Sequence, residues 1–205
     1  MGRRRNLGLA GGSLWLVASS TTFAVVSLLM VRSSAATALL VAISVVSAVL
    51  IVICLAMLRA VFQLRNDPAP ARPSEGRRIG RQFGAIVAVE GLAVTGVTLA
   101  CVLTHRWALI VPLDLIIVGL HFLPLARLFA VPRYNVTGAL FCAIPILTML
   151  LIPASARLGD AFSWIVVPSV ACAAVASITA SAGLREVGRF IRVSRAGIDK
   201  GLAGV

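Results

Sequence analysis

Long apolar runs, separated by short polar stretches, dominate the pattern along the chain. A run of about 20 apolar residues is long enough to cross the hydrocarbon core of a bilayer as a helix. The chain contains six such runs, which predict membrane-spanning helices over residues 13–31, 35–58, 84–104, 107–126, 135–152 and 161–183. Because backbone groups inside lipid must be hydrogen-bonded within the protein, the pattern predicts an all-α, polytopic membrane protein with a six-helix bundle.

The polar connections between these runs differ in length. Three are short enough to predict antiparallel helical hairpins, namely residues 32–34, 105–106 and 153–160. The one long connection, residues 59–81, contains Asn66-Asp67-Pro68 and two further prolines, which is typical of a mobile polar loop. We therefore expect a transmembrane domain over residues 1–183 and a tail over residues 184–205.

Charge indicates which side of the membrane each connection lies on. Only 13% of the residues are charged and 60% are apolar, although the net charge is +12. In a soluble protein that charge would suggest nucleic acid, but here it follows the membrane topology, so no nucleic-acid partner is expected. Of the 19 Lys and Arg residues, 16 lie on the side of the two termini and the long loop, and 3 lie on the other. The positive-inside rule then places both termini and this loop in the cytoplasm, and the chain in the inner, cytoplasmic membrane.

The tail and the small residues predict two kinds of contact. Leu184, Val187 and Ile191 recur at helical spacing among arginines, which predicts a basic amphipathic helix on the anionic inner leaflet. Alanines and serines crowd the second and last apolar runs. Such residues permit close helix approach within one bundle or between subunits, which leaves a homodimer open.

Three clearly ionisable side chains lie well inside the predicted spans: Glu90, Asp114 and His121. A carboxylate at mid-bilayer costs about 2.5–3.5 kcal/mol on insertion scales, so such groups usually face the bundle interior. Asp114 and His121 are seven residues apart and share a helix face, about 10 Å apart along the axis. Glu90 lies at the depth of His121 in the preceding span, so we expect the two to meet. This polar stripe is either a functional site or a purely structural hydrogen-bonding cluster.

A buried carboxylic acid that stays protonated in apolar surroundings is a proton donor. Protonating an alkene or epoxide requires such a water-shielded acid, and the resulting cation requires apolar or aromatic walls. Either carboxyl is a candidate for the initiating acid, and His121 for the group that tunes or reprotonates it. Phe122, Phe141 and Trp107 are candidates for the walls of a substrate cavity.

The segments "AVEGL" (88–92) and "PLDLI" (112–116) place these acids inside spans. In this feature, and in its size and multi-span layout, the chain resembles the small integral-membrane terpene cyclases, which act on prenylated aromatic substrates. The resemblance implies protonation-initiated cyclisation of a prenylated lipophilic substrate. The segment "VGLHFLPLARLFAVPRYNVTGAL" (118–140) is also similar to a motif of small uncharacterised bacterial membrane proteins, which carries no known chemistry.

Two other functions remain open. A chain of protonatable side chains across a bundle is also how proton-coupled carriers are built, although no internal repeat is apparent. The third alternative is an accessory membrane protein. The sequence has no Gly-rich phosphate loop, no metal-ligand spacing and no Asp-rich motif for magnesium diphosphate, so we expect neither metal nor cofactor.

Overall fold

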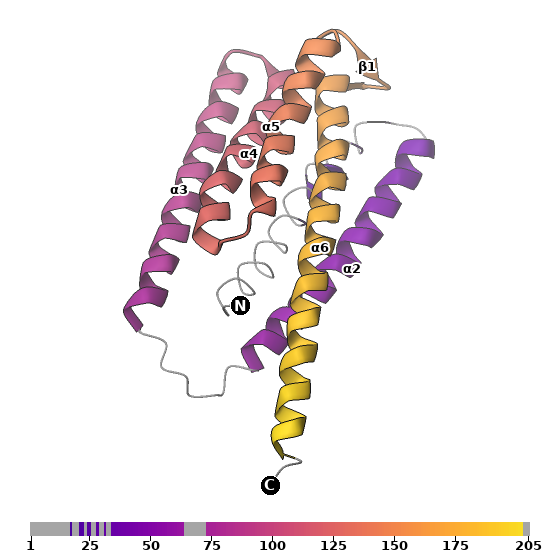
Figure 1. Ribbon diagram of the computed structural model, residues 1–205. Coiled ribbons are helices and arrows are strands. Elements are labelled where there is room, and N and C mark those ends of the chain that lie inside the picture. The colour runs from indigo at the N-terminus through magenta and orange to yellow at the C-terminus, as the bar shows by residue number, and fades with distance from the viewer. Residues whose placement is uncertain are drawn as a thin grey trace.

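The computed structural model describes residues 17, 21–22, 24–25, 28, 31, 34–63 and 73–202. Its main elements are five helices, α2 (Ser34–Gln63), α3 (Pro73–Leu103), α4 (Ile110–Phe129), α5 (Arg133–Leu151) and α6 (Ser163–Leu202) (Figure 1). A short 3-10 helix, η2 (Trp107–Leu109), precedes α4. Strands β1 (Arg157–Leu158) and β2 (Ala161–Phe162) form an antiparallel hairpin before α6, with Leu158 opposite Ala161.

Five segments of the described chain are long and apolar enough to cross a membrane: Thr37–Met57, Arg77–Leu103, Trp107–Phe129, Arg133–Leu151 and Ser163–Val193. The prediction of an all-α protein with several membrane-spanning helices is confirmed to this extent. The first predicted span, residues 13–31, lies for the most part outside the described residues. Of those that are described, Val17 and Ala24 are helical and fully buried, and the Thr21 hydroxyl donates a hydrogen bond to Ser47 of α2 (2.6 Å).

Helix lengths depart from the predicted boundaries at the basic end of the bundle. The predicted loop 59–81 is helical at both ends, because α2 continues to Gln63 and α3 already begins at Pro73. Proline fits the first turn of a helix, where no backbone N–H is required. The loop prediction is therefore corrected for residues 59–63 and 73–81, which are helical, whereas residues 64–72 lie outside the described residues.

The helices form a row in which α4, α5 and α6 pack together at the centre. Helix α3 packs on the outer side of α4, and α2 packs against α6 at the opposite edge (Figure 1). Tight connections hold the antiparallel neighbours in register. After α3, His105 adopts a left-handed conformation (φ 55°), and the N–H of Arg106 donates to the carbonyl of Cys101 (2.8 Å). Ala130 (φ 54°) ends α4 in the same way, with Val131 donating to Ala126 (2.9 Å).

Glycines allow α4 and α5 to approach closely. A Cβ atom added at Gly138 would lie 2.6 Å from the carbonyl oxygen of Gly119, and one added at Gly119 would lie 2.6 Å from the Sγ of Cys142. Next to this contact, the ring of Phe122 packs against those of Tyr134 and Phe141, with centroids 5.7 and 5.8 Å away. The α4–α5 interface is therefore the tightly packed core of the described bundle.

The predicted tail is a direct continuation of the last span, since α6 runs for 40 residues without a break. Its expected amphipathic pattern is present, because Leu184 and Val187 are buried whereas Arg185 and Arg189 are exposed. The buried face packs on the protein itself: Leu184 belongs to a cluster with α2 residues, and Val187 belongs to the central core. This part of α6 is therefore anchored to the bundle.

Candidate functional site

Glu90 on α3 and His121 on α4 form the centre of the site. The short connection between these antiparallel helices places both residues at one depth, and the Oε2 atom of Glu90 forms an ion-pair contact with Nδ1 of His121. Both residues are buried, with 9% and 6% of their surface exposed. The contact predicted from helical rise and connection length is thus present.

Asp114 lies about two turns farther along the α3–α4 interface. It is buried, and its Oδ2 atom accepts a hydrogen bond from the hydroxyl of Thr98 (3.3 Å). Counting residues outward from the two-residue connection places Asp114 level with Gly96 and Val97, one residue from its observed partner. Thr98 was missed because a threonine in an apolar helix commonly bonds its own backbone, as Thr95 does to the carbonyl of Gly91 (2.7 Å).

Three buried polar atoms of this interface have no hydrogen-bond partner among the described residues: Oδ1 of Asp114 and both ring nitrogens of His121. The imidazole touches the Glu90 carboxylate at Nδ1, but the contact lacks the alignment of a hydrogen bond. A buried polar group without a partner costs about 1–3 kcal/mol. A catalytic role is one of the reasons for which a native structure keeps such groups.

The Glu90–His121 pair lies on the floor of a groove between α3 and α4, with a volume of about 440 Å³. The other lining residues are apolar: Ala85, Ile86, Val89 and Ala93 on α3, and Ile117, Leu120 and Pro124 on α4. Val89 and Leu120 are 67% and 54% exposed, so the groove opens onto the outer surface of the bundle. In a bilayer this opening faces lipid, and its volume falls in the range of small-molecule sites.

The predicted aromatic walls do not line this groove. Phe122 and Phe141 are buried in the α4–α5 core, and Trp107 lies half exposed in η2 at the far end of the bundle. Asp114 does not line the groove either. The predicted polar stripe therefore exists along one interface but divides into two parts, the Glu90–His121 pair in the groove and the Asp114–Thr98 contact beyond it.

Among the described residues, no three His, Cys, Asp or Glu side chains are grouped to hold a metal ion. The four cysteines are free thiols, three of them buried and Cys142 partly buried. The donors that the described part of the groove offers a ligand are therefore one carboxylate and one imidazole. A carboxylate and an imidazole in contact are the side-chain types that most often act as general base and general acid.

No protein-family model, no curated protein and no solved structure matches the chain. The case for a function therefore depends on the chemistry of the groove.

Proposed function

We propose that this chain is an integral-membrane acid–base catalyst that acts on a lipophilic molecule dissolved in the bilayer. The observation that carries the proposal is the buried Glu90–His121 pair on the floor of an apolar groove that opens toward lipid. A positioned acid–base pair typically accelerates proton transfer by about 10²–10⁴-fold. The surrounding apolar walls exclude water, which strengthens electrostatic interactions inside the groove.

The proposed reaction is a protonation-initiated, metal-independent cyclisation or isomerisation of a prenylated substrate. His121 and Glu90 share the proton, and the substrate lies along the aliphatic walls above them. Since no Phe, Tyr or Trp lines the groove among the described residues, its walls offer no such ring face to stabilise a long-lived carbocation. The groove therefore favours substrates in which protonation is concerted with bond formation, such as an epoxide or a conjugated carbonyl.

The test compares cells that express the wild-type chain or the Glu90→Gln variant and are supplied with a prenylated phenol, a prenylated indole or its epoxide. The wild type is expected to form a cyclised product of unchanged mass, and Glu90→Gln or His121→Asn to abolish it. Thr95→Val is the matched control, because its exposed hydroxyl bonds only its own helix. Full conversion by Glu90→Gln would refute the proposed role of the pair.

A small proton-coupled carrier is the second candidate. It is favoured by Asp114, a second buried acid with a free carboxylate oxygen on the same interface. In this case Asp114→Asn and Glu90→Gln would both abolish pH-driven flux of the substrate into vesicles, and no new product would form. The two candidates are thus separated by analysing the same samples for product and for flux.

The membrane setting is part of the proposal. We place the termini and the connection after α2 in the cytoplasm, beside the anionic inner leaflet of the cell membrane, and include the segment 13–31 as a sixth span. Exposed apolar residues on α3, such as Leu92 and Leu99, leave a face for lipid or for a second copy of the chain in a homodimer.

A further inference from the structure

The α3–α4 groove does not end at the Glu90–His121 pair. Toward the basic end of the bundle it runs into a second hollow of about 610 Å³, and the two share Ala85, Ile86 and Pro124 as wall residues. The second hollow adds Arg78 and Gln82 from α3 and Arg127 from α4. The two hollows form one trough, apolar along most of its length and basic at one end.

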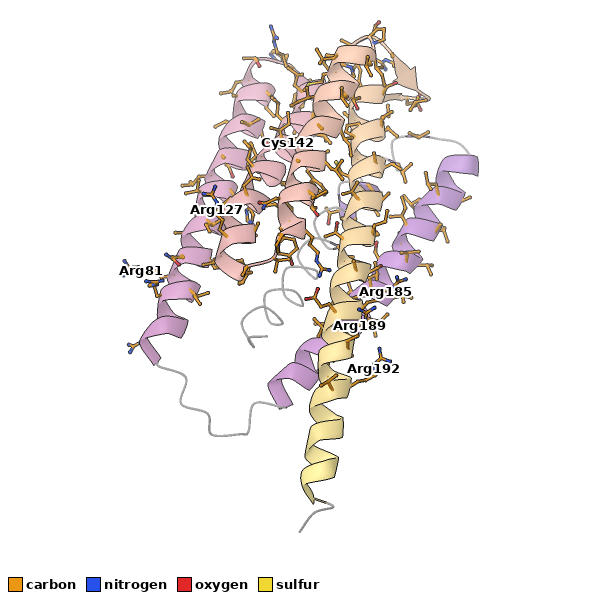
Figure 2. All side chains as sticks on the ribbon, in the orientation of Figure 1. Arg81, Arg127, Cys142, Arg185, Arg189 and Arg192 are labelled. Atoms are coloured by element: carbon orange, nitrogen blue, oxygen red, sulfur yellow. The ribbon has the colours of Figure 1, made fainter. Side chains whose placement is uncertain are left out.

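Among the described residues, none gives the basic end of the trough a negative partner. Arg78 and Arg127 are exposed, and neither forms an ion pair or a hydrogen bond with another described residue. A further hollow beside it is lined by Arg77, Arg78, Arg81 and Gln82. Figure 2 shows Arg81 and Arg127 on this side of the bundle, away from the arginines of α6. Arg78 of α3 and Arg127 of α4 therefore line one hollow, in which an anionic group could contact both side chains.

The dimensions of the trough match a lipid rather than a free anion. Along α3 it extends from Arg78 to Ala93, which is about 22 Å at the helical rise. That is over half of a hydrocarbon core roughly 30 Å thick. A ligand with its head at Arg78 would have its chain directed toward the membrane centre, as the neighbouring lipids do. Its chain would reach the depth of Glu90 about 18 Å from Arg78.

We infer that the trough binds a phosphate-bearing lipid, with the phosphate on Arg78 and Arg127 and the hydrocarbon chain along the groove beside Glu90 and His121. The planar guanidinium matches phosphate oxygens in paired hydrogen bonds, and several unpaired arginines suit a doubly charged phosphomonoester better than a zwitterionic head group. For the chemistry at the pair, this inference rests on the proposed function. It adds an anionic head group to the natural prenylated substrate, for which the uncharged prenylated compounds of the activity test are analogues that fill only the apolar part of the trough.

The test uses the full chain in nanodiscs of phosphatidylcholine that contain a small fraction of phosphatidic acid with a photoreactive diazirine in its acyl chain. After irradiation, mass spectrometry maps the adducts. They are expected on the peptides covering 78–93 and 117–128. The Arg78→Gln/Arg127→Gln variant is expected to lower this labelling by at least tenfold, because it removes two charge-assisted hydrogen bonds to the phosphate. Both side chains are exposed and have no partner among the described residues, so the variant should keep the packing of the bundle.

The matched control is Arg185→Gln/Arg189→Gln, which removes the same charge from α6 at the same end of the bundle. It should leave labelling of the two trough peptides unchanged. Three results would overturn the inference: equal loss in this control, equal labelling by a phosphatidylcholine probe of the same chain, or unchanged labelling in Arg78→Gln/Arg127→Gln. Binding of inorganic phosphate to the nanodisc-embedded chain, in the absence of any lipid adducts in the trough, would also overturn it, because the site would then bind free anions only.

Failure of this inference is distinguishable from failure of the proposed function. Glu90→Gln should retain the lipid adducts while abolishing turnover of the prenylated substrates. Loss of turnover in Glu90→Gln without lipid adducts in the wild type would leave the acid–base proposal standing and refute only the phospholipid ligand. Lipid adducts combined with full turnover in Glu90→Gln would support the phospholipid ligand and refute the acid–base proposal.

Discussion

At the scale of single residues, the buried polar groups differ in how well their hydrogen-bonding capacity is used. Asp114 accepts one hydrogen bond, from Thr98, and its second carboxylate oxygen has no partner among the described residues. A carboxyl group retained only for stability would be expected to have more partners, since each unsatisfied buried atom is costly. A substitution of Asp114 should therefore test whether the residue is retained for function or for stability.

We predict that Asp114→Asn leaves the free energy of unfolding unchanged or raises it by about 1 kcal/mol, since it removes a buried group able to ionise while keeping the side-chain shape. Thr98→Val should lower the stability by a similar amount, about 1 kcal/mol, because it leaves the carboxylate without its remaining partner. Thermal unfolding of the detergent-solubilised variants measures both. A clear fall in stability for Asp114→Asn would instead identify a structural role.

Ala130 gives a second prediction at this scale. It lies exposed at the end of α4 with φ 54°, a left-handed conformation in which an alanine Cβ costs roughly 1–2 kcal/mol and glycine costs little. Ala130→Gly should therefore raise the melting temperature. Ala139→Gly is the control, since this exposed residue lies inside helix α5, where glycine should destabilise by roughly 1 kcal/mol. If both variants lose stability, the left-handed turn is not strained.

The sequence predicted the Glu90–His121 contact but not the lining of the groove, for a geometrical reason. Depth along a helix follows from counting residues across a short connection, which is why these two residues were matched correctly. Direction around the helix axis depends on the neighbouring helices. Phe122 follows His121 by one residue, a rotation of about 100°, and this rotation turns its ring toward α5 and not toward α3. Without the helix arrangement, the phenylalanine was assigned to the wrong face.

At the scale of helices, α4 and α5 form the most closely packed pair. In membranes, where lipid tails are as apolar as the side chains, helix association depends on this kind of close packing at small residues. Gly119 and Gly138 provide it here, with no space for a Cβ atom between the backbones. The glycines of α3 differ, because a Cβ atom added at Gly91 or Gly96 would meet nothing within 4 Å.

We predict that Gly138→Ala destabilises the bundle by about 2–3 kcal/mol, because the added methyl group overlaps the backbone carbonyl of Gly119 and must force the helices apart. Gly96→Ala is the matched control, and its stability should be unchanged or slightly higher, since alanine favours the helix. Unfolding of the two variants in the same detergent gives the comparison. Similar stability of both variants would show that the close approach of α4 and α5 is not required.

Helix positions were predicted well, whereas several helix ends on the basic side of the bundle were not. The apolar runs marked the parts of the helices that would lie in lipid, and all five described spans overlap the predicted ranges. Outside lipid, helices end where capping and packing end them, which apolar runs do not record. Residues 73–81 are polar yet helical, and α6 passes Gly183 without a break because Leu184 and Val187 find protein partners.

For the molecule as a whole, the charges of the described residues are sorted between the two ends of the bundle. The starts of α3 and α5 and the ends of α4 and α6 lie at one end and carry most of the arginines, among them the labelled Arg81, Arg127, Arg185, Arg189 and Arg192 (Figure 2). Arg106 and Arg157 lie at the connections of the opposite end. The surface between the ends is rich in exposed apolar side chains, as a lipid-facing surface would be.

This charge distribution leads to a prediction about orientation. Because basic residues are retained in the cytoplasm, the end with Arg192 should be inside the cell and the β1–β2 hairpin outside. In a background without native cysteines, Ser155→Cys, at an exposed turn before β1, should react with a membrane-impermeant maleimide in intact spheroplasts. Arg192→Cys should react only after the membrane is opened by detergent, since its exposed position lies beyond the opposite end of the bundle. The reverse pattern would invert the topology and would place the basic end of the trough, and with it the head group of the proposed lipid, in the outer leaflet.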